Sequence, residues 1–401
     1  MTRVLFLTES FHPVLGGGEA HIRQLASRLV ATGTECLVLT RRGERGWATE
    51  EVLDGVRILR VSPSGPGRVG KYAMAPAALA ALARHRRDYD VIVVRGGRVL
   101  ALPGLIAGRA LGKHVVLQPE VTGELSGEIY TWGTSVDRPW VRRAVGFAAR
   151  IRNRWLRDAD AFVAISTRVH AEILAAGVAP ERIAEIPHGV DIRRFHPASS
   201  DERRSLRLKL GLPDDGPIIV FTGRLLRGKG IDVLLGAFGR LARRHPGARL
   251  VLVGSGDGQS LSIEDEARGA AASETLMGRV SFTGRVGNVE DYLRAADVFA
   301  FPSLFEAMPL SVIEAAACGL ACVASRVGGI PDVLEDGSSG RLVPPGDTEG
   351  LEAALDGLLR NADERVSLGA AARAAVLERF DFDASVEGYR ALFTEVARVG
   401  R

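Results

Sequence analysis

Short runs of apolar, β-forming residues alternate with helical stretches along almost the whole chain, and this alternation restricts the fold more than any other feature. In the first half the runs cover 3–8, 35–40, 56–61, 90–95, 114–119 and 160–166. Each run is apolar on both faces, which is typical of strands in a parallel sheet that helices cover on both sides. The first half therefore predicts an α/β domain with a doubly wound parallel sheet.

The alternation starts again after a polar, turn-rich stretch at 196–217. The second series of apolar runs covers 218–223, 249–254, 280–284, 297–303 and 321–325. A chain of 401 residues is also longer than one hydrophobic core usually serves. We therefore expect two Rossmann-like domains, at 1–196 and 197–382. A C-terminal helix in 383–401 follows, and its periodicity does not tell whether it crosses back to the first domain.

Composition and charge limit the classes of function. No apolar run approaches the roughly 20 residues that span a bilayer, and residues 1–10 are typical of a buried first strand rather than a signal peptide. We expect a cytoplasmic protein. The formal net charge of +4 is too small and too dispersed to indicate nucleic-acid binding, but it suits phosphate-bearing substrates. Cys36, Cys318 and Cys322 lack the further ligands of a zinc set, so we expect no metal site.

A glycine-rich, cationic segment at 222–230 directly follows an apolar run, where parallel sheets usually bind ligands. Arg224 and Lys229 place two cations in one turn beside glycines that allow close backbone approach, which suits a diphosphate. The segment also fits the G-x-x-x-x-G-K spacing of a P-loop, but Gly230 stands where the magnesium-binding hydroxyl belongs. A P-loop hydrolase and a solvated basic loop remain alternatives.

Two glutamates in the segment 301–319, Glu306 and Glu314, are separated by seven residues. If a helix begins near Met308, Glu306 precedes it and Glu314 lies in its second turn. Eight residues of helix rise about 12 Å, more than the ~5 Å between the carboxyls of a retaining glycosidase. The spacing suits a long ligand, with one carboxylate on sugar hydroxyls, the other on a ribose diol, and a diphosphate at the helix N-terminus. Solvated surface glutamates are the alternative.

The order of these and further motifs resembles glycosyltransferase family 4 (glycosyl transferases group 1), the retaining enzymes of the GT-B fold. The resemblance rests on segments 12–33, 186–197, 223–230, 253–258, 280–286, 301–319 and 327–347. It implies two Rossmann-like domains that face each other across a cleft. It also implies transfer of a hexosyl-type sugar from a nucleotide-diphosphate sugar, expected to be a UDP- or GDP-sugar, to a hydroxyl of a glycan, glycolipid precursor or small aglycone. Neither a cofactor nor a metal is implied.

The resemblance also implies roles for individual residues. Arg224 and Lys229 would hold the donor diphosphate and stabilise the leaving group, Glu306 would position the transferred sugar, and Glu314 would accept hydrogen bonds from the ribose. The remaining implied donor-binding residues are Gly16 and Gly17 at the phosphates, Arg285 and Val286 at the nucleobase, and the backbone of Ala307, Met308, Pro309 and Leu310 at the sugar. The implied mechanism is a front-side displacement in which a donor phosphate oxygen takes the acceptor proton.

The chain departs from the family pattern at several positions. Gln118 to Glu120 occupy the place where many members carry a His near the acceptor, so the acceptor-side partner is left open. His188 replaces a common Asn, and Asp332 shortens a usual Glu. A non-transferring GT-B relative, such as a sugar-nucleotide epimerase, is a further alternative.

The segment 137–158 predicts a basic amphipathic helix. One face carries the apolar residues Trp140, Ala144, Phe147, Ile151 and Trp155, and the rest is crowded by Arg142, Arg143, Arg150, Arg152, Arg154 and Arg157. Two interpretations are open: a helix whose apolar face packs on the core of the first domain, or a helix that lies on the anionic inner face of a membrane.

Overall fold

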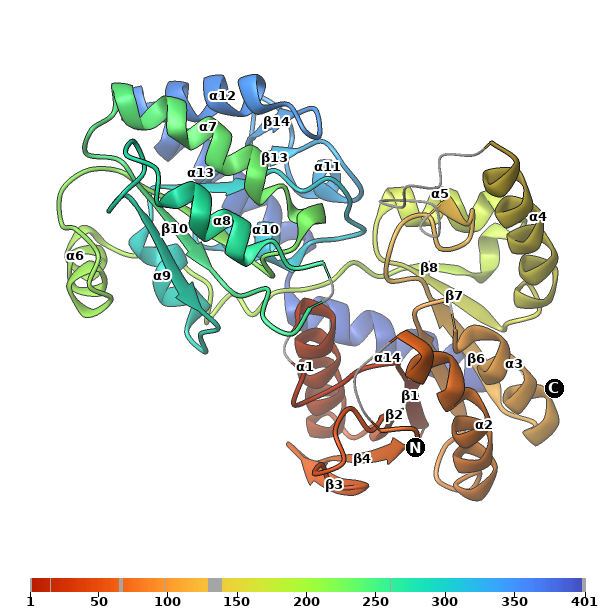
Figure 1. The fold of residues 1–401 in the computed structure, drawn as a ribbon. Helices are drawn as coiled ribbons and strands as arrows, with labels where there is room; N and C mark the ends of the chain where they lie inside the picture. Colours follow the sequence, from red (N-terminus) through yellow and green to blue (C-terminus); the bar gives the residue numbers. More distant parts are fainter. Residues whose placement is uncertain are drawn as a thin grey trace. The chain divides into compact units, whose positions relative to one another are not determined.

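The computed structural model describes residues 2–14, 16–64, 68–97, 99–128, 139–259 and 261–398, and they form two compact units (Figure 1). The first unit comprises the chain up to Pro187 together with the residues from Ala384 onward, and the second runs from His188 to Asp383. The boundary expected from the sequence was 196, with 383–401 as a separate segment. Residues 188–196 lie in the second unit, and the last helix lies in the first.

The described part of the first unit is built on an eight-stranded sheet with strand order β3-β4-β2-β1-β5-β6-β7-β8. All neighbours pair in parallel except β3 and β4, which form an antiparallel edge. The strands are β1 (Arg3–Leu7), β2 (Glu35–Arg41), β3 (Glu50–Leu53), β4 (Val56–Val61), β5 (Val91–Arg95), β6 (His114–Gln118), β7 (Ala161–Ala164) and β8 (Ile183–Glu185). The helices are α1 (Gly17–Ala31), α2 (Arg68–Arg84), α3 (Ala101–Leu111), α4 (Pro139–Leu156), α5 (Thr167–Ala175) and α14 (Phe382–Arg398), with a 3-10 turn η2 (Pro180–Arg182).

The described part of the second unit is built on a six-stranded parallel sheet with strand order β11-β10-β9-β12-β13-β14. The strands are β9 (Ile218–Thr222), β10 (Arg249–Val253), β11 (Val280–Gly284), β12 (Val298–Phe301), β13 (Ala321–Ser325) and β14 (Arg341–Val343). The helices are α6 (Ser200–Lys209), α7 (Ile231–Arg244), α8 (Glu264–Ala271), α9 (Val289–Ala295), α10 (Leu310–Ala317), α11 (Ile330–Val333), α12 (Thr348–Arg360) and α13 (Ala362–Arg379), with a 3-10 turn η3 (Arg227–Lys229). Every predicted apolar run forms a strand, so the predicted class of two doubly wound α/β domains is confirmed.

Each sheet reverses its strand order at one point. In the first unit β1 lies between β2 and β5, and in the second unit β9 lies between β10 and β12. The loops that leave the carboxyl ends of such a strand pair turn to opposite faces of the sheet and open a crevice between them. Ligand sites are therefore expected beyond β1 and β5, and beyond β9 and β12.

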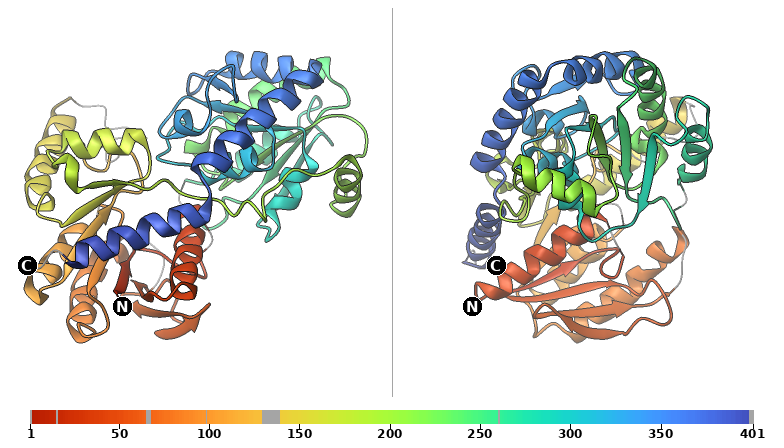
Figure 2. Two further views of the ribbon diagram at one scale, coloured as in Figure 1. Left: turned by 180° about the vertical axis from the view of Figure 1, so that it is seen from behind. Right: turned by 90° about the vertical axis from the view of Figure 1, so that its left-hand side faces the viewer.

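The last helix, α14, completes the core of the first unit (Figure 2). The Phe393 ring meets the Phe6 ring of β1 edge to face, with centroids 6.3 Å apart. Tyr389 is fully buried, and its hydroxyl donates a hydrogen bond of 2.8 Å to Gln118 at the end of β6. The sequence analysis left open which domain this helix joins, and these contacts place it on the first.

The orientation of α4 answers the question that its sequence left open. Trp140, Phe147 and Trp155 are exposed, whereas Ala149 and Leu156 on the opposite face are buried. The core-facing interpretation of the aromatic face is therefore wrong: small and aliphatic residues make the packed side. Residues 137 and 138 lie outside the described residues, and so does the side chain of Arg142.

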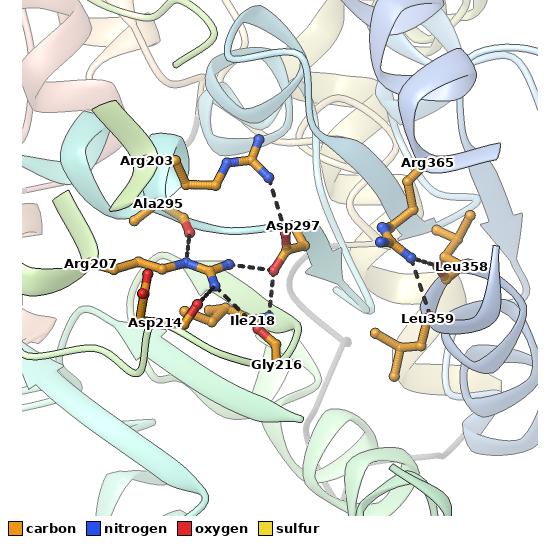
Figure 3. Close-up of polar contacts among 10 residues, drawn as sticks. All are labelled: Arg203, Arg207, Asp214, Gly216, Ile218, Ala295, Asp297, Leu358, Leu359 and Arg365. Atoms are coloured by element: carbon orange, nitrogen blue, oxygen red, sulfur yellow. Dashed lines mark hydrogen bonds and ion pairs between the residues drawn. The ribbon is translucent and has the colours of Figure 1, made fainter. Parts of the chain in front are cut away.

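Buried Arg207 forms a hydrogen-bonded cluster at the first residues of strands β9 and β12 (Figure 3). The Arg207 guanidinium on α6 donates to Asp297 Oδ2 at 2.6 Å, to the Ala295 carbonyl at 3.0 Å and to the Gly216 carbonyl at 3.2 Å. Asp297 Oδ2 also accepts from the Ile218 backbone N–H at 2.7 Å. Because Ile218 opens β9 and Asp297 directly precedes β12, this cluster fixes the two strands at the switch point relative to each other.

We predict that Arg207→Ala destabilises the second unit by about 3 kcal/mol, because it removes the buried partner of Asp297 Oδ2 and the donor to the Ala295 and Gly216 carbonyls, while Arg203 still contacts Asp297 Oδ1 at 3.0 Å. Urea unfolding separates the two units, since all four tryptophans, at 47, 132, 140 and 155, precede the second unit. Far-UV circular dichroism follows both units and tryptophan fluorescence follows the first. The circular dichroism transition should shift while the fluorescence transition stays in place.

The matched control is Arg204→Ala on the same helix. The Arg204 guanidinium lies 3.5 Å from Asp214, and both side chains are exposed. Its loss should cost less than about 1 kcal/mol. Equal effects of the two substitutions would show that burial of Arg207 does not matter.

Candidate functional site

Two loops meet at the switch point of the second sheet, one after β9 and one after β12. The β9 loop contains η3, and the Gly228 carbonyl accepts from the Leu304 N–H at 2.9 Å. The predicted diphosphate segment and the first predicted glutamate therefore lie on hydrogen-bonded neighbours, although about 75 residues separate them.

The close approach of these loops requires glycine at position 230. Gly230 has φ of +67°, and a Cβ there would lie 2.0 Å from the Pro302 carbonyl oxygen. Neither a serine nor a threonine fits without moving the second loop. The position therefore cannot supply the hydroxyl that a P-loop uses to bind magnesium, which argues against the P-loop alternative.

Lys229 and Glu306 form an ion pair at the centre of the site. The Lys229 ammonium contacts Glu306 Oε1 and lies over the Phe301 ring, 5.4 Å from its centroid. Ser303 Oγ donates to the same Glu306 oxygen at 2.6 Å. Glu306 is buried, and the Lys229 side chain keeps some exposure. The structure thus holds this carboxylate in one orientation and leaves the ammonium accessible to an anion.

Gly328 packs against the main chain that carries Glu306. A Cβ at Gly328, where φ is +57°, would lie 2.1 Å from the Glu306 carbonyl oxygen. The next residue, Gly329, donates its N–H to the Ala307 carbonyl at 2.6 Å. The loop after β13 therefore supports the Glu306–Ala307 peptide, a role that the sequence analysis did not foresee.

Glu314 lies in the second turn of α10, as the seven-residue spacing predicts. The helix begins at Leu310 with Pro309 as its N-cap, slightly later than the expected start near Met308. Burial raises the pKa of the Glu314 carboxyl to about 7, the nearby Arg194 guanidinium opposes this shift, and Glu290 adds to it. This carboxyl therefore changes charge near neutral pH.

Arg194 and Glu290 border Glu314 and were missed by the sequence analysis. Arg194 donates to Glu290 at 2.6 Å and to the Gly287 carbonyl at 3.0 Å, and the bond to Glu290 raises the pKa of the guanidinium. Arg194 belongs to segment 186–197, which carried the family resemblance, so a charged residue there was the available signal.

The remaining predicted donor residues lie in several environments. Arg224 is exposed, and its side chain makes no ion pair within the described part of the chain. Arg285 donates to the Asp257 carbonyl at 2.8 Å, and Val286 is partly exposed. Ala307, Met308 and Pro309 are buried in the loop before α10, and Leu310 is its first residue. Gly16 and Gly17 lie at the start of α1, which belongs to the first unit, and their contact with a donor stays a prediction.

A largely buried polar cluster lies around Gln118 and Glu120, where the family resemblance leads us to expect a His. Gln118 Nε2 donates to Glu120 at 3.0 Å, and Arg95 at the end of β5 donates to the same Glu120 oxygen at 2.7 Å. Arg95 Nη1 also lies 3.3 Å from His21 Nδ1. The cluster lies beside the switch point of the first sheet and is the candidate acceptor-side site.

The other two departures from the family pattern lie in the second unit. His188 is buried at the start of that unit, and Asp332 lies in the first turn of α11.

Metal-binding clusters and membrane-spanning helices are both absent from the described ranges. No group of three or more His, Cys, Asp or Glu side chains there is arranged to hold a metal ion. No described helix is both long and apolar enough to cross a membrane. The three cysteines are buried free thiols, and burial raises the pKa of Cys36 to about 12.

Comparisons with known proteins identify both units. Residues 216–361 match the model of the family described as glycosyl transferases group 1, and residues 16–189 match a glycosyl transferase 4-like domain. The chain is 30% identical to a phosphatidyl-myo-inositol mannosyltransferase of Mycolicibacterium smegmatis, over 92% of this chain and 87% of that protein.

Solved structures share the fold. Sucrose-phosphate synthase from Thermosynechococcus elongatus is 25% identical and has a TM-score of 0.83, with 99% of each chain covered. HepE from Anabaena, solved in complex with UDP-glucose, is 20% identical and has a TM-score of 0.78, with 98% of this chain and all of the other covered. The predicted GT-B fold is confirmed.

We predict that Gly328→Ala displaces the Glu306–Ala307 peptide and destabilises the second unit more than backbone strain alone. A non-glycine residue in this left-handed region costs about 1–2 kcal/mol, and the clash with the Glu306 oxygen adds to it. Gly337→Ala is the control, because its φ is +80° and the nearest contact of a Cβ is a flexible arginine end at 3.5 Å. The measurement is the urea midpoint by circular dichroism. Equal midpoints for both variants would contradict the support role.

Proposed function

Because this chain belongs to the glycosyl transferases group 1 family, we propose that it moves a hexosyl residue from a nucleotide-diphosphate sugar to an acceptor hydroxyl with retention of configuration and without a metal. The observation that carries this proposal is the Lys229–Glu306 pair at the switch point of the second sheet, with Glu314 on the following helix. In this proposal Lys229 supplies a cation for the diphosphate, Glu306 a carboxylate for the sugar and Glu314 a carboxylate for the ribose.

Each part of the donor has a matching group in this proposal. The diphosphate lies against Arg224 and Lys229, which neutralise its charge. The transferred sugar is held by Glu306, whose orientation Ser303 fixes. The ribose diol donates to Glu314. The nucleobase lies at Val286, at the end of β11.

Binding of the diphosphate competes with an existing interaction. Glu306 already neutralises Lys229 in the structure, so an incoming diphosphate must share or replace that partner. Glu306 is then released to accept hydrogen bonds from sugar hydroxyls. Donor binding and sugar positioning are therefore coupled through one ammonium group.

The proposed reaction proceeds on one face of the sugar. The acceptor oxygen forms its bond to the anomeric carbon on the face from which the diphosphate oxygen leaves, and that phosphate oxygen takes the hydroxyl proton. Arg224 and Lys229 stabilise the negative charge that grows on the leaving group, the electrostatic contribution that dominates many enzymatic barriers. No protein base is required in this scheme.

A donor screen tests the proposal directly. UDP-, GDP-, ADP- and dTDP-sugars are compared by thermal shift, since a ligand at about 100 times its Kd stabilises by about 2.7 kcal/mol. The donor that binds is then incubated with candidate acceptors in EDTA, and NMR gives the configuration of the product. An inverted product, or an absolute need for magnesium or manganese, would overturn the proposed mechanism.

We predict that Lys229→Ala and Arg224→Ala each reduce donor affinity and kcat/KM at least tenfold, because each removes a charge-assisted contact worth roughly 1.5–3 kcal/mol. The control is Arg227→Ala in the same loop, whose exposed side chain pairs with Glu266 at 3.0 Å. It removes the same charge and should leave donor affinity within about twofold. If the Lys229→Ala or Arg224→Ala variant kept wild-type turnover, the substituted residue would not belong to the donor site.

We predict different effects for the two glutamates. Glu306→Gln lowers kcat strongly but keeps or raises donor affinity, because it frees Lys229 for the diphosphate. Glu314→Gln mainly weakens donor binding. The measurement is kcat and donor Kd for each variant. Similar losses of donor affinity in both variants would contradict these roles.

Donor affinity should also depend on pH through Glu314. Its carboxyl has a pKa of about 7 without donor, and the ribose hydroxyls donate to the ionised form. Affinity should therefore increase roughly tenfold from about pH 6 to about pH 8. Calorimetry with an intact nucleotide sugar, whose diphosphate diester does not titrate in this range, measures the profile. Glu314→Gln should make donor affinity nearly independent of pH. If that variant kept the pH dependence of the wild type, another group would be its cause.

A further inference from the structure

Helix α4 carries an aromatic stripe that the described residues of the first unit leave uncovered. The exposed fractions are 64% for Trp140, 58% for Phe147, 46% for Ile151 and 57% for Trp155. Successive residues of this set lie four or seven positions apart and so share one face of the helix. The stripe extends about 22 Å, from the rise of fifteen helical residues. Contiguous exposed apolar surface of this kind marks an interaction site.

Contacts on the opposite side fix the rotation of α4. Ala149, Asn153 and Leu156 are buried, and Asn153 Nδ2 donates to the Leu125 carbonyl at 2.9 Å. Arg152 also reaches inward, to the Glu124 carbonyl. Turning the aromatic stripe toward the core would break these hydrogen bonds, so the stripe is held outward.

Positive charge flanks the stripe on one side. Arg143, Arg150 and Arg154 are exposed and project within one quadrant beside the aromatic residues, at 100° per residue. The helix contains no acidic residue from Pro139 to Leu156. A partner for this face must therefore offer both apolar surface and negative charge along the length of the helix.

We propose that α4 docks on the surface of an anionic lipid bilayer, with its aromatic stripe among the lipid headgroups and its arginines on lipid phosphates. A bilayer offers a flat apolar layer beneath dense negative charge, and tryptophan side chains prefer that boundary. A second copy of this chain fits less well, because a twofold contact would bring the same arginines together.

Docking would also affect the candidate acceptor-side cluster. The loop 123–127 follows Gln118 and Glu120 in the chain and packs under α4 through the Asn153–Leu125 bond. With α4 docked, this loop lies about one helix diameter, roughly 10–12 Å, from the lipid surface. Resting on the proposed function, this position indicates an acceptor hydroxyl that belongs to a membrane glycolipid.

Co-sedimentation of the full chain with vesicles tests the proposal without any activity measurement. Vesicles of phosphatidylcholine with phosphatidylglycerol are compared with pure phosphatidylcholine at ~0.15 M salt. We expect binding to the anionic vesicles and a blue shift of tryptophan emission. The triple variant Arg143→Gln, Arg150→Gln, Arg154→Gln should bind about a hundredfold more weakly. The variant Phe147→Ser, Ile151→Ser, Trp155→Ser should lose binding at least tenfold.

Control variants remove exposed groups of the same two kinds from the second unit. Leu208→Ser with Val366→Ser removes exposed apolar side chains, at 84% and 71% exposure, and Arg193→Gln, Arg204→Gln, Arg243→Gln removes three exposed cations. Both controls should bind vesicles like the wild type. Failure of the wild type to bind, or equal binding by the α4 variants, overturns the proposal but leaves the proposed function untouched. A dimer that depends on the stripe, without vesicle binding, would assign the face to a second copy.

Discussion

The hydrogen-bonded neighbours β9 and β12 are the constraint on which the candidate donor site depends. Val298 pairs with Ile219, and Phe299 pairs with Val220, at the point where strand order reverses. At one end the Arg207–Asp297 cluster locks the strands together, and at the other end the Lys229 and Glu306 loops emerge side by side. The buried Arg207–Asp297 cluster at one end of the two strands therefore helps to fix the positions of the Lys229 and Glu306 loops at the other end.

The site is organised by internal counterions before any ligand arrives. Lys229 is neutralised by Glu306, and Arg194 is neutralised by Glu290 beside Glu314. Such pairs hold long side chains in place and limit the cost of burying charge. In the proposed function, an anionic donor would exchange one set of partners for another instead of ordering a disordered site, which would favour rapid binding and release.

The sequence predicted the structure correctly where a residue pattern is compatible with only one kind of element. Apolar runs such as 218–223 have few alternatives to a buried strand, and the cationic loop and glutamate pair follow those runs directly. It was not informative for β8 and β14, which are three residues long, or for β3, whose sequence EEVL is half acidic. Helical spacing identified the aromatic face of α4 but not its direction, because periodicity records that faces differ and not which one meets the core. Ser303, Arg194 and Gly328 were missed because their roles arise from contacts with residues distant in sequence.

The position of α14 has a consequence for how the protein is made. Phe393 and Tyr389 belong to the core of the first unit, yet they follow the entire second unit in the chain. A growing polypeptide exposes the surface around Phe6 and Gln118 for as long as the ribosome takes to add roughly 200 residues, about 10–40 s at typical elongation rates. The second unit completes its own core within that interval. The first unit therefore keeps an open sheet face until α14, which follows the whole second unit in the chain, packs against it.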